Sequence, residues 1–371
     1  MKIVIWTGNA WETWGPHSID AGGIGGSETA AIRIAKHLAV MGHEVSIIGQ
    51  VTPGTFDGVE YLDFQPFAYR HQAVVCDVFI SSRDLSALRL INPVAATTGR
   101  QVISVLWMHD VSAGDDWRGE MPEYTYVFCL SPWAKKVAQS YYSHVRREKF
   151  ILTRNGIEPS MFSPELGMPW KSTGKVVYSS SPDRGLNRLL DYWPDILKME
   201  PSARLHVYYG FDTWKKMAAQ RRDKDALLTI QYYESRLEMM ADQRVVNHGR
   251  VGQAELTKAW LDADLWLYPT NFTETSCITA MEAQAAGAWP ITTRLAALPD
   301  TIRDGAFVDP PNTRDGYREE FLSHVADALL SRDSTIGMRR YVIRQLALAD
   351  SSWRSVAEEW SELFYSSAGK T

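Results

Sequence analysis

Residues 264–287 read DLWLYPTNFTETSCITAMEAQAAG, and this stretch holds a strand, a loop and a helix in that order. DLWLY at 264–268 is apolar after its first residue, which is typical of a strand that is covered on both faces. Pro269 ends the strand, and Gly287 follows a run of small residues as the expected end of a helix. This order predicts one unit of a parallel α/β sheet.

The loop inside this stretch carries two acidic residues at a suggestive spacing. We expect Ser276 to cap the helix, which places Glu274 in the loop before it and Glu282 about two turns into it. The first backbone N–H groups of a helix have no partner within the helix and attract anions. Carboxylates beside an anion site suit a ligand that also bears hydroxyl groups. The residues expected at the helix start are Thr275, Ser276, Cys277 and Ile278.

Apolar runs of the same kind recur along the chain in two sets. The first set is expected at residues 2–6, 44–48, 76–81, 101–107 and 124–131, and the second at 175–180, 204–210, 244–249, 264–270, 288–293 and 305–310. Between the sets, residues 153–174 are rich in proline and glycine, as a linker is. We therefore expect two Rossmann-like βαβ domains that face each other across a cleft, at 1–160 and 161–350. Residues 351–371 are expected to form a helix that packs back toward the first domain.

Composition excludes several classes of protein. Apolar residues make up 45% of the 371 residues and charged residues 22%, as in a globular protein of more than one domain. The start MKIVIWTGNAW has no long apolar region, so we expect no signal peptide and a cytoplasmic location. Cys76, Cys129 and Cys277 lie far apart, which indicates reduced thiols. The net charge of −5 argues against a dedicated nucleic-acid-binding protein.

A second glycine-rich motif, GGIGGS at 22–27, runs directly into a helix expected from Ser27 to Met41. The dinucleotide fingerprint fails because position 28 is Glu, and the GK[ST] of an NTPase loop is absent. Glycines here allow a close approach of the backbone to a ligand. Ser27 can cap the helix, and Glu28 suits its positive end. The alternative is a plain surface turn.

Taken together, the chain resembles the family-4 nucleotide-sugar glycosyltransferases of the two-Rossmann (GT-B) type. The segments that carry this resemblance are GGIGGSE, WMHD at 107–110, RNGIE at 154–158, SSPDRGL at 180–186, HGRV at 248–251 and the two glutamates with seven residues between them. They occur in the order of that family and span about residues 1–310. The resemblance implies the transfer of a sugar from a nucleotide diphosphate sugar, with UDP- or GDP-sugars as the expected donors. It implies retention of the anomeric configuration, no cofactor and no obligatory metal.

The resemblance also assigns roles to single residues. The catalytic roles fall to His109, which meets the donor sugar, to Arg184 on the diphosphate and to Glu274 on the sugar hydroxyls. Donor binding falls to Gly25, Gly26, Arg188, Gly249, Arg250, Val251, Thr275, Ser276, Cys277, Ile278 and Glu282. Within that set, Glu282 is matched to the carboxylate that binds the ribose, and residues 249–251 to the segment whose backbone contacts the base.

One position departs from the family pattern. An arginine is common five residues before the diphosphate cation, and here that position is Ser179. Arg188, one helical turn after Arg184, is a candidate replacement, and a solvated charge on a helix is the alternative. His109 follows the apolar strand VISVLW, where active-site loops begin, although a lone histidine is commonly structural.

Other features keep two interpretations each. Asp262 and Asp264 mimic a metal-binding DxD motif, and we interpret them as the end of a helix and the start of a strand. The basic residues at 135–136 and 146–149 form either a solvated face or a weak peripheral contact with anionic lipid. Trp6, Trp11 and Trp14 form either an acceptor platform or part of the core. For the whole chain, the alternatives to a transferase are a non-hydrolysing nucleotide-sugar epimerase and a non-catalytic sugar-nucleotide-binding protein.

Overall fold

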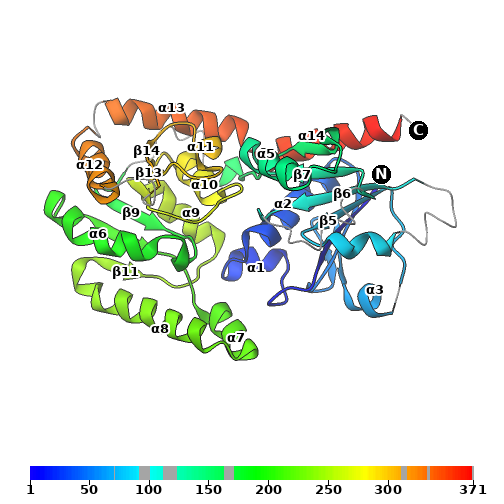
Figure 1. Ribbon diagram of the computed structural model, residues 1–371, viewed down its shortest axis with the longest axis horizontal. Coiled ribbons are helices and arrows are strands. Elements are labelled where there is room, and N and C mark those ends of the chain that lie inside the picture. Colours follow the sequence, from blue (N-terminus) through cyan, green and yellow to red (C-terminus); the bar gives the residue numbers. More distant parts are fainter. Residues whose placement is uncertain are drawn as a thin grey trace. The chain divides into compact units, whose positions relative to one another are not determined.

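The computed structural model describes residues 1–70, 72–91, 101–111, 123–162, 171–310, 316–331 and 335–369. The chain forms two compact units. The first unit comprises residues 1–19, 24–156 and 352–371, and the second comprises residues 20–23 and 157–351 (Figure 1). Part of the expected linker, residues 163–170, lies outside the described residues.

The first unit is built on an eight-stranded sheet in the order β3-β4-β2-β1-β5-β6-β7-β8. Its strands are β1 (Lys2–Gly8), β2 (Glu44–Gly49), β3 (Gly54–Phe56), β4 (Val59–Asp63), β5 (Val78–Ser82), β6 (Ile103–Met108), β7 (Tyr126–Cys129) and β8 (Phe150–Leu152). All neighbouring pairs are parallel except β3 and β4. The five expected strands are confirmed. β3, β4 and β8 were not predicted, because β3 and β8 have three residues each and a glutamate interrupts the apolar residues of β4.

Helices flank this sheet. They are α1 (Pro16–Ala21), α2 (Gly26–Val40), α3 (Gln65–Tyr69), α5 (Pro132–Tyr141) and α14 (Trp353–Ala368). The last of them comes from the C-terminal end of the chain and packs within the first unit. Trp360 on α14 donates its Nε1–H to Thr153 Oγ1 at 2.8 Å, and Phe364 stacks on Phe128 of β7.

The second unit holds a six-stranded parallel sheet in the order β11-β10-β9-β12-β13-β14. Its strands are β9 (Lys175–Tyr178), β10 (Arg204–Val207), β11 (Val245–Asn247), β12 (Leu265–Tyr268), β13 (Trp289–Thr293) and β14 (Ala306–Val308). All six lie within the stretches that the sequence predicts. In chain order this is the doubly wound arrangement 3-2-1-4-5-6, whose direction reverses between β9 and β12. Ligands of open α/β sheets bind beyond the carboxyl ends of the strands at that reversal.

The helices of the second unit cover both faces of its sheet (Figure 1). They are α6 (Leu186–Met199), α7 (Asp212–Arg221), α8 (Lys224–Met239), α9 (Gln253–Asp262), α10 (Ile278–Ala286), α11 (Leu298–Thr301), α12 (Tyr317–Leu330) and α13 (Thr335–Asp350). The helices α7 and α8 follow each other closely along the chain. Arg222 adopts a left-handed conformation with φ 56°, and Asp223 then caps α8 by accepting the Ala226 N–H at 3.0 Å.

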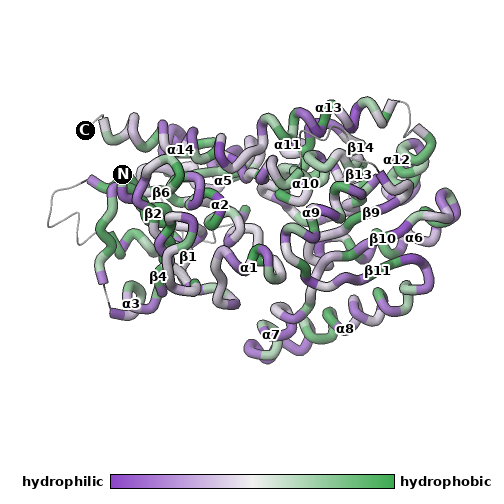
Figure 2. The backbone as a smooth tube through the Cα atoms, turned by 180° about the vertical axis from the view of Figure 1, so that it is seen from behind, coloured by the Kyte–Doolittle hydropathy of each residue, from purple (hydrophilic) through white to green (hydrophobic). Residues whose placement is uncertain are grey.

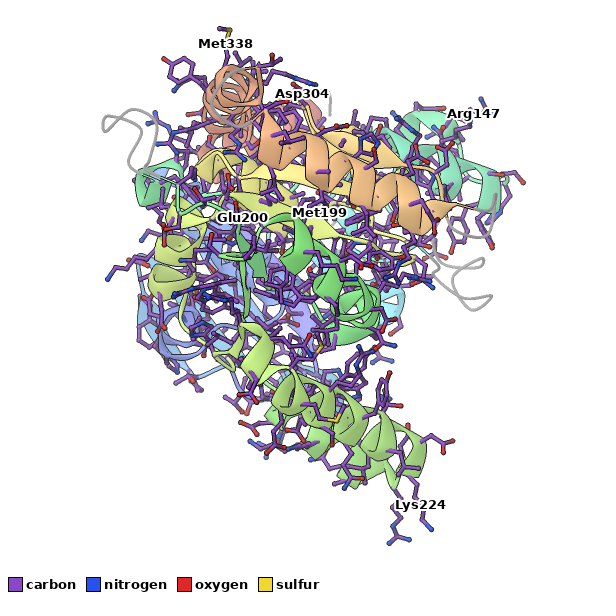
Figure 3. The ribbon with its side chains drawn as sticks, turned by 90° about the vertical axis from the view of Figure 1, so that its left-hand side faces the viewer. Arg147, Met199, Glu200, Lys224, Asp304 and Met338 are labelled. Carbon is purple, nitrogen blue, oxygen red and sulfur yellow. The ribbon has the colours of Figure 1, made fainter. Side chains whose placement is uncertain are left out.

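Apolar side chains fill the interior of the second unit. Trp193, Trp260 and Trp266 have no exposed surface. Along α8, hydrophobic and hydrophilic positions alternate (Figure 2), and the apolar Ile230 faces the core. On the outside of the unit, Met338 of α13 is 74% exposed (Figure 3). A core on both faces of a short parallel sheet explains why its strands read as continuous apolar runs.

Candidate functional site

The two loops that follow β9 and β12 touch at the reversal point of the second sheet. Gly185, after β9, has φ +124°, and a Cβ there would lie 2.7 Å from the Pro269 carbonyl oxygen after β12. Only glycine combines that backbone conformation with so close an approach. The contact brings Arg184, in the 3₁₀ turn Pro182–Arg184, beside the loop that carries Glu274.

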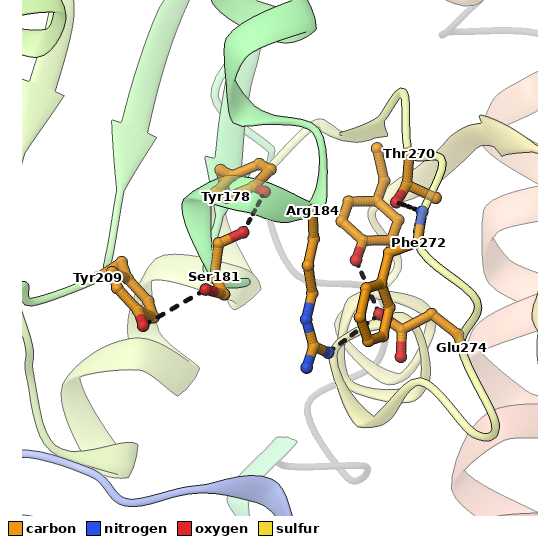
Figure 4. Close-up of polar contacts among 8 residues, drawn as sticks. Tyr178, Ser181, Arg184, Tyr209, Thr270, Phe272 and Glu274 are labelled. Carbon is orange, nitrogen blue, oxygen red and sulfur yellow. Dashed lines mark hydrogen bonds and ion pairs between the residues drawn. The ribbon is translucent and has the colours of Figure 1, made fainter. Parts of the chain in front are cut away.

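Arg184 and Glu274 form an ion pair in this place. Arg184 Nη1 lies 3.3 Å from Glu274 Oε1, and the guanidinium lies 3.9 Å above the centre of the Phe272 ring (Figure 4). The Tyr268 hydroxyl donates to the same Oε1 at 2.7 Å. Glu274 is 6% exposed and the Arg184 side chain 36%. The pair therefore has a buried carboxylate and a cation that is open to a ligand.

The environment fixes the protonation of the groups around this pair. Burial lowers the pKa of Arg184, the Glu274 carboxylate raises it, and the net pKa lies above its usual value. Burial, and next the nearby Glu274 carboxylate, raises the pKa of Tyr268 well above its usual value. The same two causes raise the pKa of the Cys277 thiol. Arg184 is thus a permanent cation, Tyr268 a permanent O–H donor, and Cys277 is not a thiolate nucleophile.

Hydrogen bonds hold the loop between Tyr268 and Glu274 in one shape. Thr270 Oγ1 accepts the Phe272 N–H at 2.9 Å (Figure 4). Thr293 on β13 donates its hydroxyl to the Thr270 carbonyl at 2.6 Å. The Glu274 carbonyl accepts the Ala297 N–H at 3.1 Å. A loop tied at three points keeps the carboxylate in a defined place before any ligand arrives.

The helix start after this loop differs from the prediction in one respect. α10 begins at Ile278 and its N-terminal cap is Cys277, with no side-chain hydrogen bond, so the expected cap by Ser276 is wrong. Residues 270–274 form turns of their own, which moves the start of the helix along the chain. Thr275, Ser276 and Cys277 are buried at this helix end. Gly287 ends α10 in the left-handed conformation, as expected.

Glu282 lies on α10 and meets a residue that the sequence analysis did not single out. Gln253 Nε2 donates to Glu282 Oε1 at 2.5 Å. Gln253 is the first residue of α9 and follows the loop that holds Gly249, Arg250 and Val251. Within that loop, Gly249 has φ +66°, and Arg250 donates to Thr213 Oγ1 at 2.9 Å. The structure therefore links the expected ribose residue to the expected base-contacting segment through Gln253.

The position of Arg188 differs from the expectation of one helical turn after Arg184. Arg184 ends a 3₁₀ turn, Gly185 interrupts the backbone, and Arg188 lies in the first turn of α6. Burial raises the pKa values of Tyr192, Tyr233 and Tyr317, and the nearby charge of Arg188 opposes this rise, which places Arg188 among these tyrosines. No contact that the structure describes joins Arg188 to Glu274. Its role in donor binding stays a prediction.

The last residues of the glycine motif form the start of α2 in the first unit. Gly25 is the N-terminal cap residue with φ −59°, and Gly26 is the first residue of the helix, so the expected cap by Ser27 is wrong. Ser27 instead donates its hydroxyl to Glu28 Oε2 at 2.9 Å, and Glu28 Oε1 pairs with Arg83 at 3.2 Å. The Glu28 carboxylate lies against Gly25, where an added Cβ would overlap Glu28 Oε2, and a carboxylate there complements the positive end of α2.

His109 directly follows β6 in the first unit. Its ring lies 4.3 Å from the ring of Trp107, centre to centre. Burial, and next the positive charge of Arg83, lowers the pKa of His109 to about 3. The imidazole is therefore neutral at physiological pH and can donate one hydrogen bond without carrying charge.

Several minor expectations are also decided by the structure. Trp6 and Trp14 are buried, whereas Trp11 is 52% exposed, so the first two belong to the core. Cys76, Cys129 and Cys277 are free thiols. Within the described ranges, no helix is both long and apolar enough to cross a bilayer.

The acidic pair at 262–264 serves the fold. Asp262 ends α9 and pairs with Lys175 at 2.6 Å, and Asp264 precedes β12 and pairs with Arg340 at 2.6 Å. Among the residues that the structure describes, no group of three or more His, Cys, Asp or Glu side chains is placed to hold a metal ion. Of the basic residues near α5, Lys149 donates to the Tyr124 carbonyl at 2.7 Å, whereas Arg147 is exposed (Figure 3). The peripheral lipid contact stays a prediction.

The fold of the chain is that of the two-Rossmann glycosyltransferase structures. Residues 174–327, within the second unit, match the family model of the glycosyl transferases group 1. A search of curated protein sequences finds no match.

Solved structures resemble the chain over its whole length. Sucrose-phosphate synthase from Thermosynechococcus elongatus aligns with TM-score 0.69 at 15% identity, and the alignment covers 100% of both chains. HepE from Anabaena, solved in complex with UDP-glucose, aligns with TM-score 0.70 at 15% identity, over 99% of this chain and 100% of HepE. A glycosyltransferase from Rickettsia africae aligns with TM-score 0.68 at 13% identity, over 98% and 97%. At these identities the likeness concerns the fold.

Proposed function

We propose that the protein is a glycosyltransferase that moves a sugar from a nucleotide diphosphate sugar to an acceptor hydroxyl, with retention of configuration and without a metal. One observation carries the proposal. A partly open cation, Arg184, lies 3.3 Å from a buried carboxylate, Glu274, where the loops after β9 and β12 meet. A cation suits a diphosphate and a carboxylate suits sugar hydroxyls, so the two together suit the two halves of such a donor.

The remaining residues of the second unit complete a donor site in this proposal. The N-terminal end of α10 supports the diphosphate through its backbone N–H groups and its helix dipole. Glu282 accepts hydroxyl hydrogens of the ribose while Gln253 holds its other oxygen. The backbone of Gly249–Val251 contacts the base. The match of residues 174–327 to the glycosyl transferases group 1 supports this assignment.

The chemistry follows from the charges. As the bond between the anomeric carbon and the diphosphate oxygen breaks, negative charge grows on the diphosphate, and Arg184 and the helix start stabilise it. The acceptor oxygen bonds to the same face of the anomeric carbon, which retains the configuration. The acceptor proton passes to the leaving phosphate oxygen. The products are a nucleoside diphosphate and the glycosylated acceptor.

A donor screen tests the proposal. Thermal unfolding is measured with UDP-, GDP-, ADP- and TDP-sugars, beginning with UDP-glucose because HepE binds it in its solved complex. A ligand at 100 times its Kd stabilises the native state by about 2.7 kcal/mol, which is readily measured. We expect at least one nucleotide sugar to stabilise the protein. If none does, the proposal is wrong.

Turnover is then measured with the donor from that screen, a panel of sugar and lipid acceptors, and EDTA. We expect a nucleoside diphosphate to be released with EDTA present, and NMR to show an unchanged anomeric configuration in the product. Activity that disappears in EDTA and returns with Mg²⁺ or Mn²⁺ would contradict metal independence. Conversion of the donor into an epimer without any acceptor would show that the reaction is an epimerisation.

A further inference from the structure

Tyr268 is fixed more firmly than the other side chains around Glu274. It is the last residue of β12 and has no exposed surface. Its ring stacks on Trp266, with the ring centres 5.1 Å apart, and lies 6.1 Å from Tyr178 at the end of the neighbouring strand β9. A side chain held on a strand by aromatic neighbours places its hydroxyl in a defined position.

The hydroxyl of Tyr268 shares one carboxylate oxygen with Arg184. Tyr268 donates to Glu274 Oε1 at 2.7 Å, and Arg184 Nη1 approaches the same atom at 3.3 Å (Figure 4). No residue that the structure describes donates to the second oxygen, Oε2. A carboxylate has about four acceptor positions on two oxygens, so two donors on Oε1 leave the capacity of Oε2 intact.

The two donors are not equivalent. The Arg184 side chain is partly exposed, and Phe272 beneath it is also partly exposed, so this pair can shift toward a diphosphate. Tyr268 is enclosed and cannot follow. When Arg184 turns to an anion, the Tyr268 hydroxyl is the contact that still holds the Glu274 carboxylate in orientation.

We propose that Tyr268 is a positioning residue for sugar recognition. It holds Glu274 by Oε1 so that Oε2 accepts hydrogen bonds from hydroxyl groups of the donor's sugar. The inference rests on the proposed function, because it assigns the sugar half of the donor to Glu274. It adds that recognition of the sugar, as distinct from the nucleotide, depends on a tyrosine that does not touch the donor.

The test compares UDP-glucose with UDP by titration calorimetry on the full chain. The variants are Tyr268→Phe, Glu274→Gln and the double variant. Tyr124→Phe is the matched control, because this buried hydroxyl lies in the first unit and donates to the Leu85 carbonyl at 2.9 Å and not to a carboxylate. We expect Y268F to weaken UDP-glucose binding about tenfold or more, as for the loss of a hydrogen bond to a charged group, and to leave UDP binding unchanged. Y124F should change neither.

The double variant separates positioning from a general loss of structure. We expect Y268F to have no further effect on UDP-glucose binding in the E274Q background, because Tyr268 acts through Glu274. The inference is overturned if Y268F weakens UDP and UDP-glucose binding equally, if its effect persists in the E274Q background, or if Y124F has the same effect. If Y268F does not fold by circular dichroism, Tyr268→Met removes the hydroxyl with an unbranched apolar side chain and is measured in its place.

Failure of the inference is distinct from failure of the proposed function. If the wild-type protein binds neither UDP-glucose nor UDP, and no other nucleotide sugar stabilises it, the proposed function fails and the inference fails with it. If the wild type binds UDP-glucose more tightly than UDP and Y268F keeps that difference, only the inference fails.

Discussion

Arg184 is the residue on which the proposed chemistry depends most. It is held as a cation by Glu274 and supported from below by Phe272 at 3.9 Å. We expect Arg184→Ala to lower kcat on the order of 10²–10³-fold, because charge on the diphosphate rises as the glycosidic bond breaks. Steady-state kinetics with the donor from the screen measures this.

Arg188 supplies the control for that measurement. It lies in α6 among tyrosines and has no described contact with Glu274. We expect Arg188→Ala to change kcat much less than Arg184→Ala does. Equal losses would assign Arg188 the second phosphate contact that Ser179 cannot make, and wild-type turnover of Arg184→Ala would refute the role given to Arg184.

Glu282 should behave differently, since a carboxylate that binds ribose contacts the ground state and the transition state alike. We expect Glu282→Ala to raise KM and leave kcat nearly unchanged. Gln253→Ala, which removes the donor that holds Glu282 Oε1, should raise KM by a smaller factor. A fall in kcat at constant KM in Glu282→Ala would move this residue from binding to chemistry.

At the scale of elements, the junction between two loops depends on one glycine. Gly185 has φ +124°, and an added Cβ would meet the Pro269 carbonyl oxygen at 2.7 Å. We expect Gly185→Ala to lower the free energy of unfolding by about 1–3 kcal/mol, from backbone strain and the forced separation of the loops. Urea unfolding followed by circular dichroism measures this.

Gly316→Ala is the matched control in the same unit. Gly316 also has a positive φ, +87°, but no atom of the residues that the structure describes lies within 4 Å of an added Cβ. Gly316→Ala should therefore lower the free energy of unfolding by about 1 kcal/mol, from the strained backbone conformation alone. If both variants lose the same stability, the contact with Pro269 contributes nothing, and the close approach does not define the junction.

The elements themselves were largely predictable from the sequence, and their ends were not. Strands buried on both faces leave continuous apolar runs, so the long strands of both sheets were found. β3 and β8 have three residues each, which is too short for such a run to stand out. The caps at Ser27 and Ser276 were wrong because a cap depends on where the preceding loop ends. The glycines before Ser27 and the turns at 270–274 decide that in three dimensions.

Only those residues of the candidate site that belong to a recognisable motif could be predicted from the sequence. The order of motifs pointed to Arg184, Glu274 and Glu282, and the structure brings the first two together. Tyr268, Phe272 and Gln253 were missed because a tyrosine at a strand end, a loop phenylalanine and a glutamine are commonplace in sequence. The one available signal for Tyr268 is its place as the last strand residue before Pro269. Arg184 and Glu274 are 90 positions apart in the sequence, and only the folded chain shows that they are in contact.

At the scale of the whole molecule, the expected functions divide between the two units. Apart from Gly25 and Gly26, the residues expected to bind the donor lie in the second unit, whereas His109 lies in the first. His109 is neutral, since burial and the charge of Arg83 lower its pKa to about 3. A neutral imidazole can hydrogen-bond a sugar hydroxyl, and it does not titrate as pH varies above about 5. The pH profile of the transfer rate should therefore contain no transition near pH 6.5, where an ordinary histidine titrates.

We expect His109→Ala to reduce transfer by about 10²-fold, a typical order for the loss of a positioned polar group. Binding of free UDP, or of the nucleotide that the donor screen selects, should be nearly unchanged. Gln253 donates to Glu282 within the second unit, and residues 249–251 belong to the same unit. Calorimetry with the free nucleotide, beside a transfer assay on the same preparation, measures both. His109→Asn, which keeps a hydrogen-bond donor, should recover part of the transfer. Equal losses of nucleotide affinity and transfer in His109→Ala would show that His109 supports the fold or the nucleotide, and the assignment of the sugar to His109 would be wrong.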